Sequence, residues 1–505
     1  MAPPKRSLNE LMQAAKANIS QLRAEQQASR SGNKVIDRYR KMENPQIEYT
    51  TRTAEQEVDT VAICPTNPDY MIIGTYSLVK KDDPRDYEAQ TRRGTIQVMT
   101  VAPEFKPLYA GMLPPQLDMI SFPSAVLDIH FHPSDGTLLG VATSNAHVYF
   151  FRFIKHGDVL GRRVITRLLP LGSVRVSEDD EYGLTALVTQ FTWFSEMRKH
   201  GVLGISDVQD VSFAATTSFG DTKIISTSVP LIKDLFDERA NQPPSELPIT
   251  ITDIHKHDLE AWTVAAVTLR SATETQVNSI YRMVLSGGDD SALIASAVNL
   301  PCDSSQPSSP LISSSDKSGP TALPQWLWKD RRNHTAGVVA ILPLPSNDGP
   351  RIPYPRTTVI TGSYDEYLRV FELDTKTYRA VWQTELRLAG GVWRLKVLDQ
   401  YTTPTEGDIE DHHSLVLASL MHGGAAVLRL TYSADSISWT ITPLMTFRAG
   451  HESMVYCCDA RLETGPEGVA PTYTVVSTSF YDMKICTWKF VDHFKAQQGQ
   501  QNKIA

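Results

Sequence analysis

The stretches "ITGSYDEYLRVF" (residues 360–371) and "STSFYDMKICTW" (residues 477–488) share a pattern that decides the fold. In each, small residues precede a turn, and an aspartate in the turn is followed by alternating apolar positions. "TTSFGDTKIIS" (216–226) and "LSGGDDSALIAS" (285–296) show the same order. The pattern indicates short β-strands joined by tight turns, and its repetition indicates units that bury a core only by packing on one another.

Weaker units complete a series of seven: "IIGTYSLVKK" continued by "GTIQVMTV", then "VATSNAHVYFF", and "LASLMHGGAAVLRL". Their spacing is compatible with blades of about 40 to 45 residues plus loops. We therefore predict an all-β fold, a seven-bladed WD-type β-propeller, over residues 46–492. The strand-like "QIEYTTRT" (46–53) is expected to join the last blade, because a closed ring leaves no free sheet edge.

Two histidine and aspartate pairs support this prediction. In WD-type blades, a histidine before the innermost strand bonds the aspartate in the turn between the second and third strands. His334 precedes Asp365 by 31 residues, and His451 precedes Asp482 by the same 31 residues. An aromatic residue follows each aspartate by six positions. We predict that these four residues are structural.

Three segments lie outside the repeat. Residues 1–45 contain an apolar stripe of helical period that begins at Ser7, and we predict a short N-terminal α-helical extension there. The Ser/Pro-rich residues 301–325 are predicted to form a mobile loop between the fourth and fifth blades, because this composition cannot bury a core. Residues 493–505 are predicted to be a disordered tail.

Composition narrows the class of protein. Hydrophobic residues make up 41% and charged residues 21% of the 505 positions, which is typical of a soluble globular protein. A net charge of −8 argues against direct nucleic-acid binding, which needs a basic surface. No apolar run reaches the length of a membrane span, and no secretory signal is evident. The five cysteines lack CxxC spacing, so neither a metal site nor a disulfide framework is indicated, and we expect a cytoplasmic protein.

The sixth unit departs from the others. When "LASLMHGGAAVLRL" is aligned with "ITGSYDEYLRVFEL", His422 takes the position of Asp365. In the stretch "LAGGVWRLKV" (388–397), Gly390 and Gly391 stand where neighbouring units place a histidine. Two glycines remove side chains and let another molecule, or another backbone, come close. We therefore interpret His422 as a functional residue at the mouth of the central channel.

Several motifs carry a resemblance to a known family: "HDLEAW" (257–262), "LSGGDD" (285–290), "TGSYDEYLRVFE" (361–372), "GGVWRLK" (390–396) and "TSFYDMKICTW" (478–488). Together they resemble the WD-repeat diphthine methylesterases of eukaryotic diphthamide biosynthesis. The resemblance covers roughly the last half of the chain and continues more weakly upstream. It implies an enzyme, a carboxylic ester hydrolase that removes a methyl ester from methylated diphthine on elongation factor 2. It implies no cofactor.

This activity suggests roles for individual residues. Ester hydrolysis needs a base and donors to the developing oxyanion, and His422 suits the base. The backbone amides of Gly390 and Gly391, or the Arg394 guanidinium, are candidate oxyanion donors. The candidate substrate-binding residues offer aromatic faces and carboxylates to the trimethylammonium group, and they are Trp262, Trp393, Tyr364, Tyr481, Glu260 and Asp289.

Other interpretations of these residues stay open. Trp393 can be a core aromatic, Arg394 a solvated strand end, and the two tyrosines packing residues of their turns. The alternative function is a non-catalytic scaffold, such as a trafficking or ubiquitin-ligase adaptor, because most propellers of this kind bind proteins. A scaffold predicts stable partners, no turnover, and no effect of replacing His422.

Overall fold

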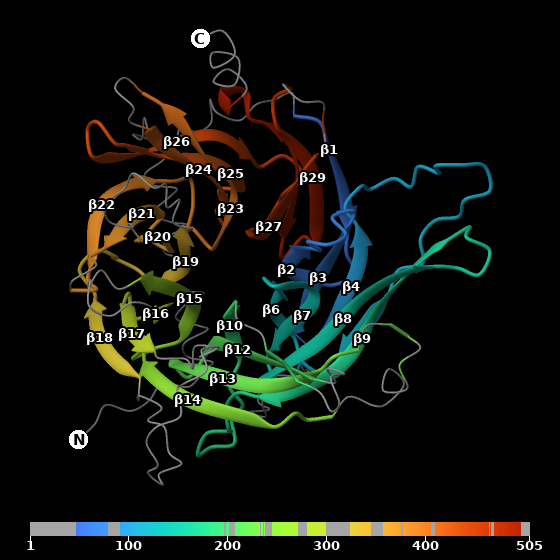
Figure 1. Ribbon diagram of the computed structural model, residues 1–505, viewed down its shortest axis with the longest axis horizontal. Coiled ribbons are helices and arrows are strands. Elements are labelled where there is room, and N and C mark those ends of the chain that lie inside the picture. Colours follow the sequence, from blue (N-terminus) through green and yellow to red (C-terminus); the bar gives the residue numbers. More distant parts are fainter. Residues whose placement is uncertain are drawn as a thin grey trace, which may run out of the picture. The chain divides into compact units, whose positions relative to one another are not determined.

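A computed structural model shows a ring of β-sheets (Figure 1). It describes residues 47–78, 91–195, 198–200, 208–232, 234–235, 237, 245–270, 280–298, 324–344, 357–374, 377–405, 410–463, 465 and 469–495. Seven sheets of four or five strands are present in this part of the chain, and antiparallel pairing joins consecutive strands within each. The predicted seven-bladed propeller is confirmed.

The first half of the chain forms three blades. Blade 1 contains β2 (Glu57–Ile63), β3 (Tyr70–Leu78), β4 (Arg92–Thr100) and β5 (Met119–Phe122), and blade 2 contains β6 (Val126–His132), β7 (Asp135–Thr143), β8 (His147–Gly157) and β9 (Val164–Arg175). Blade 3 contains β10 (Val188–Trp193), β12 (Val208–Thr217), β13 (Asp221–Pro230) and β14 (Ile249–Lys256), with β11 (Arg198–His200) paired to β12.

The second half forms the other four. Blade 4 contains β15 (Ala261–Arg270), β16 (Ile280–Gly288), β17 (Leu293–Val298) and β18 (Gln325–Asp330), and blade 5 contains β19 (Val338–Leu344), β20 (Thr357–Ser363), β21 (Tyr367–Leu373) and β22 (Ala380–Arg387). Blade 6 contains β23 (Arg394–Pro404), β24 (Glu410–Ser419), β25 (Ala425–Ser433) and β26 (Ser438–Phe447), and blade 7 contains β27 (Val455–Leu462), β28 (Thr472–Ser479), β29 (Lys484–Val491) and β1 (Tyr49–Thr53).

The ring closes as the sequence predicts. β1 is the outer strand of blade 7 and pairs with β29, with Tyr49 opposite Trp488. Each innermost strand contacts the innermost strands on both sides, and β27 contacts β2. Figure 1 shows these seven inner strands facing the centre of the ring, with β1 in blue beside β29 in red.

The core is divided among the blade interfaces. The described residues form seven hydrophobic clusters, and each joins two neighbouring blades. For example, Val61 and Ile73 of blade 1 pack with Val476 and Ile485 of blade 7. Burial of one such aliphatic side chain stabilises the fold by about 1.5 to 3 kcal/mol. The inner strands are therefore held from both sides, which fixes the side chains that begin them.

Two predicted boundaries are wrong, and one lies outside the described residues. The 301–325 insertion falls inside blade 4, because β18 follows it and pairs with β17 of the same sheet. The tail prediction fails for residues 493–495, which form a helical turn in which Phe494 stacks on Arg429, with 4.1 Å between guanidinium carbon and ring centroid. The extension at 1–45 lies outside the described residues. Within the described part of the chain, no helix is long and apolar enough to cross a bilayer.

Candidate active site at the inner rim of the ring

The beginnings of the seven innermost strands share one backbone feature. In six of them a register shift follows the first or second residue and leaves the next residue bulged out of the pairing, while blade 6 places Trp393 just before β23. A bulge redirects a side chain out of the regular ladder. We call these equivalent positions the inner rim; they are Asp59, Leu127, Thr189, Trp262, Val339, Trp393 and Tyr456.

Aromatic rings gather on one side of the inner rim. Trp393 lies at their centre, with ring centroids 5.7 Å from Trp262, 5.8 Å from Tyr364 and 5.2 Å from Tyr456. Trp262 and Tyr456 belong to blades 4 and 7, and Tyr364 belongs to the β20–β21 turn of blade 5. The aromatic cluster is therefore assembled from four blades.

The cluster extends toward solvent through blade 7. Tyr456 stacks near Phe480 with 4.8 Å between centroids, and Phe480 contacts Tyr481 at 5.0 Å and Tyr76 at 5.8 Å. Tyr481 is 61% exposed, whereas Trp393 is only 8% exposed. Tyr481, a predicted substrate-binding residue, thus lies at the solvent-exposed end of a series of aromatic rings that begins at the buried Trp393.

The carboxyl groups of Asp59 on the inner rim and of Asp289 beside it are shifted toward the protonated form. Burial raises the pKa of Asp289 to about 6, with repulsion from Glu260 and Asp290 adding to the rise and Trp262 opposing it. Burial raises the pKa of Asp59 to about 7, and Arg394 opposes that rise. Carboxylates with weakened solvation attract cations that carry little hydration of their own.

Three polar atoms among these residues lack hydrogen bonds of normal geometry. Trp262 Nε1 and Asp289 Oδ1 are buried and interact with each other only outside normal hydrogen-bond geometry, and Arg394 Nη1 is buried without a hydrogen-bond partner. The Arg394 guanidinium carbon lies 5.4 Å from the Trp393 ring centroid, so its charge faces an aromatic side chain. Buried polar atoms without partners are costly in a folded protein, so these atoms are available to water or to a ligand.

The prediction that Gly390 and Gly391 replace the histidine is wrong, because Leu388 stands five residues before Trp393, as His257 stands five before Trp262. The two glycines instead let backbone of the same blade come close. A Cβ on Gly390 would lie 2.2 Å from the Leu420 carbonyl oxygen, and one on Gly391 would lie 2.8 Å from Met421 Sδ. The 420–424 turn therefore packs directly against the 388–391 segment. The same turn accepts a hydrogen bond from Val455 N to Met421 O at 2.9 Å, which fastens it beside Tyr456.

His422 stands on this turn and is exposed. The strand register supports the alignment that equates it with Asp365. Arg394 pairs with Ser419 and Ser419 with Ala425, as Ala340 pairs with Gly362 and Gly362 with Leu368 in blade 5. The predicted catalytic residues His422, Gly390, Gly391 and Arg394 therefore border the inner rim from blade 6.

The predicted structural histidines are buried, but their partners differ from the prediction. His451 contacts Ser479 Oγ through Nδ1 at 2.7 Å and Ser477 Oγ through Nε2 at 2.8 Å. Ser479 in turn bonds Asp482, so a hydroxyl stands between the predicted partners. Trp488 Nε1 donates to Ser477 Oγ at 3.1 Å and completes the chain.

In blade 5, His334 Nε2 lies 2.8 Å from Thr361 Oγ1, while Nδ1 lacks a partner. Asp365 is bound instead by Thr335 N at 3.0 Å and by Arg369 at 2.9 Å. Burial lowers the pKa of His334, and likewise that of His451, to about 4. Both histidines are therefore neutral and structural at physiological pH.

A direct histidine and aspartate contact occurs where the sequence prediction did not place one. In blade 4, His257 Nδ1 lies 2.8 Å from Asp290 Oδ1, and Nε2 lies 2.7 Å from Ser286 Oγ. Their 33-residue separation, rather than 31, hid the pair from a search at constant spacing. The order resembles a catalytic triad, but His257 and Ser286 are 2% and 0% exposed, so the contact is structural.

Sequence reasoning also missed the rim residues Asp59 and Tyr456, and the buried Asp128 beside them. Asp128 lies 2.9 Å from His130 Nε2 and accepts a hydrogen bond from Phe191 N at 3.2 Å. An available signal was the start of each innermost strand, where "VDT", "VLD", "VTQ", "AWT", "VVA", "VWR" and "VYC" align. All six predicted substrate-binding residues lie in or beside the aromatic cluster or act electrostatically on its members.

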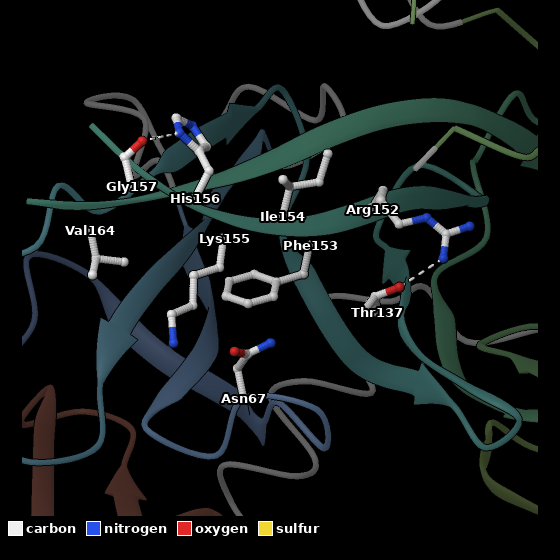
Figure 2. Close-up of a pocket in the computed structure, with 9 residues that line it drawn as sticks. All are labelled: Asn67, Thr137, Arg152, Phe153, Ile154, Lys155, His156, Gly157 and Val164. Atoms are coloured by element: carbon white, nitrogen blue, oxygen red, sulfur yellow. Dashed lines mark hydrogen bonds between the residues drawn. The ribbon is translucent and has the colours of Figure 1, made fainter. Parts of the chain in front are cut away.

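A separate cavity of about 570 Å³ lies away from this site, along β8 of blade 2. Figure 2 shows Lys155 beside Asn67 at one end and Arg152 hydrogen bonded to Thr137 at the other. Arg152 is also paired with Asp135 at 2.5 Å. None of the predicted site residues lines this cavity.

Comparisons with solved structures give low similarity. Sqt1 of Chaetomium thermophilum, bound to the N-terminus of the ribosomal protein L10, is 12% identical with a TM-score of 0.41, and the match covers 84% of this chain and 85% of that chain. Sqt1 of Saccharomyces cerevisiae is 11% identical with a TM-score of 0.40, covering 89% and 99%. No protein-family model matches the chain.

Curated sequences give closer relatives. A Schizosaccharomyces pombe protein named diphthine methyltransferase is 26% identical over 422 residues, which are 83% of this chain and 91% of the relative. A Saccharomyces cerevisiae protein of the same name is 25% identical over 243 residues, and the match spans about half of its length (49%) and 46% of this chain. Over most of its length, this chain is therefore similar to a curated protein named diphthine methyltransferase.

Proposed function

We propose that the protein acts in diphthamide biosynthesis and hydrolyses the methyl ester of methylated diphthine on elongation factor 2. The names of the two relatives support a role on diphthine. The observation that carries the reaction class is the inner rim, where an aromatic cluster, two carboxyl groups of raised pKa and three orphaned polar atoms meet.

The rim suits the cationic part of such a substrate. A trimethylammonium group donates no hydrogen bonds and is attracted by aromatic faces and by carboxylates. Trp262 and Tyr364 offer faces around Trp393, and Asp289 supplies charge beside them. Because Asp289 Oδ1 lacks a hydrogen bond of normal geometry, a bound cation would relieve an existing cost rather than compete with a partner.

The rim also suits an ester carbonyl. Arg394 Nη1 is a buried donor without a hydrogen-bond partner. Attack of water on a methyl ester places negative charge on the carbonyl oxygen, and preorganised donors lower that barrier. Arg394 thus has the chemistry of the oxyanion donor that the sequence predicts.

The residues around the site favour water over a protein nucleophile. Ser363 and Ser479 are fully buried, and both hydroxyls are hydrogen bonded within their blades. Burial raises the pKa of the Cys457 thiol to about 11, so this thiol is not an activated nucleophile at neutral pH. The proposed reaction therefore consumes one water and releases methanol and diphthine.

The experiment incubates the purified protein with elongation factor 2 that carries methylated diphthine and follows the modified peptide by mass spectrometry. Loss of one methyl unit supports ester hydrolysis. The names of the relatives favour methyl transfer, so a second reaction contains unesterified diphthine and S-adenosylmethionine. Gain of a methyl unit there would replace hydrolysis by transfer, and no change in either reaction, with stable binding, would leave a scaffold.

A further inference from the structure

We propose that Asp59 is the general base of the inner rim, which activates the water that attacks the ester carbon beside Arg394. This inference rests on the proposed ester hydrolysis. It differs from the sequence-based prediction, which gives the role of base to His422. Four observations about the rim support it: position, lack of a partner, charge environment and division of labour with Asp289.

The position of Asp59 is set by the backbone. It is the bulged residue between Val58 and Thr60 of β2, and thus equivalent to Trp262 and Tyr456 at the inner rim. Asp59 is the one ionisable carboxylate among the seven rim positions. The same backbone feature that presents the aromatic faces therefore presents an acid.

Asp59 differs from neighbouring acids in having no partner. Among the described residues, its side chain makes no hydrogen bond or ion pair, although it is only partly exposed. Asp128 is bound by His130 and Phe191 N, and Asp459 is bound by Lys396 and Ile63 N. Those two acids brace the fold, whereas Asp59 is left unpaired at a position where burial is costly.

Charged groups from three other blades act on Asp59. Arg394 of blade 6 lowers its pKa, while Asp128 of blade 2 raises it, and Tyr456 of blade 7 in turn responds to the Asp59 charge. Burial dominates and brings the pKa of Asp59 to about 7, whereas the pKa of Asp128 is lowered by His130 and Arg394 against the effect of burial. Two carboxyls whose pKa values are driven apart beside one cation form an arrangement suited to proton transfer.

Asp289 and Asp59, the two carboxyl groups with raised pKa values, have different surroundings, and these surroundings suit different roles. Asp289 lies beside Trp262, Glu260 and Tyr364, an aromatic and negative environment that suits the trimethylammonium group. Asp59 lies near Arg394, whose free donor suits the carbonyl oxygen of the ester. The geometry thus places cation binding at blade 4 and the hydrolytic chemistry between blades 1 and 6.

The reaction step balances without a further reagent. The Asp59 carboxylate takes a proton from water while the water oxygen bonds to the ester carbon, and the carbonyl electron pair moves onto oxygen beside Arg394. The intermediate then reforms the carbonyl and breaks the bond to the methoxy oxygen, and the Asp59 carboxylic acid returns its proton to that oxygen. The products are methanol and the free acid of diphthine.

The test measures methanol release from methylated elongation factor 2 by wild type, Asp59→Asn, Asp59→Glu, Asp289→Asn and His422→Ala. Asp59→Asn is expected to lower kcat by about 100-fold or more with KM changed by less than about threefold, and Asp59→Glu to recover part of the rate. Asp289→Asn is expected mainly to raise KM. Asp253→Asn, an exposed acid on β14, is the charge-matched control and should behave as wild type.

The pH profile separates a base from a structural acid. Wild-type kcat/KM is expected to rise through about pH 7 as Asp59 ionises, and this limb should be absent from the residual rate of Asp59→Asn. A thermal unfolding scan of each variant excludes loss of fold. Asp59→Asn with more than a tenth of the wild-type kcat, or a His422→Ala variant that alone loses turnover, would overturn the assignment while leaving the esterase intact. Wild type without turnover would overturn both.

Discussion

Blades 4 and 6 place different residues at the same positions. In blade 4, His257 joins Asp290 to Ser286, and His255 of the preceding blade bonds Ser286 and Ser296 at 2.6 and 2.7 Å. In blade 6, the equivalent sites hold Leu388 for the histidine, Ala418 for the hydroxyl, and His422 for the aspartate. Blade 4 therefore uses these positions for a chain of buried hydrogen bonds, and blade 6 has no such chain at them.

The difference shows how one fold separates support from chemistry. A buried histidine with hydroxyl or carboxylate partners is locked in one tautomer and kept from solvent. A blade without that chain can bring its turn backbone against Gly390 and present Trp393 and Arg394 at the inner rim. Blades 4, 5 and 7 thus hold the wall of the site, and blade 6 supplies part of its working surface.

The largest expected loss of stability comes from breaking the chain of buried polar contacts in blade 4. His257→Ala should lower the free energy of unfolding by about 3 kcal/mol, because it removes the buried contacts of His257 with Asp290 and Ser286 and leaves a cavity in their place. His422→Ala, on an exposed turn, should change it by less than about 0.5 kcal/mol. Urea unfolding of both variants measures the contrast. Equal losses would show that the blade 6 turn bears as much of the fold as the blade 4 chain.

The second effect tests the close backbone contact of blade 6. Gly390→Ala should destabilise the fold by about 2 kcal/mol. The new Cβ would clash with the Leu420 carbonyl oxygen, and relieving the clash requires a shift of the backbone. Gly391→Ala should cost less, since it meets the flexible end of Met421. Gly157→Ala, which has open space around it, is the control. Denaturant unfolding should rank the three in this order, and a neutral Gly390→Ala would contradict the packing described.

The seven-unit pattern and the closing strand could be predicted because register-defining turns recur in the sequence. The place of the 301–325 insertion could not, since β18 pairs with β17 across it and no local signal marks that pairing. The aromatic partners of Trp393 were predicted in part, from motif positions around Trp262 and Tyr364. Asp59 was missed because its proposed role depends on residues of three other blades, which no local stretch of sequence contains.

Hydrogen-bond partners were the least predictable feature. Constant spacing correctly placed His334 and His451 before their strands, yet whether a ring nitrogen meets a carboxylate or an intervening hydroxyl depends on shifts of about one ångström. Ser479 intervenes in blade 7, while His257 meets Asp290 directly in blade 4. Sequence spacing identifies the members of such a chain, and only coordinates identify its links.

The smallest effect concerns pH and the intact blade 7. Burial holds the pKa of His451 at about 4, below the 6.5 of an exposed histidine. Between these two pH values the unfolded state binds a proton at this residue and the native state does not. Stability from this group is therefore complete above pH 6.5 and is lost as pH falls toward 4. Between pH 7.5 and 5.5, wild type should lose about 1 kcal/mol more than His451→Gln, measured by urea unfolding at both pH values. Identical pH slopes for the two proteins would mean that the contacts with Ser477 and Ser479 accommodate the protonated imidazole. The polar chain of blade 7 would then be less rigid than that of blade 4.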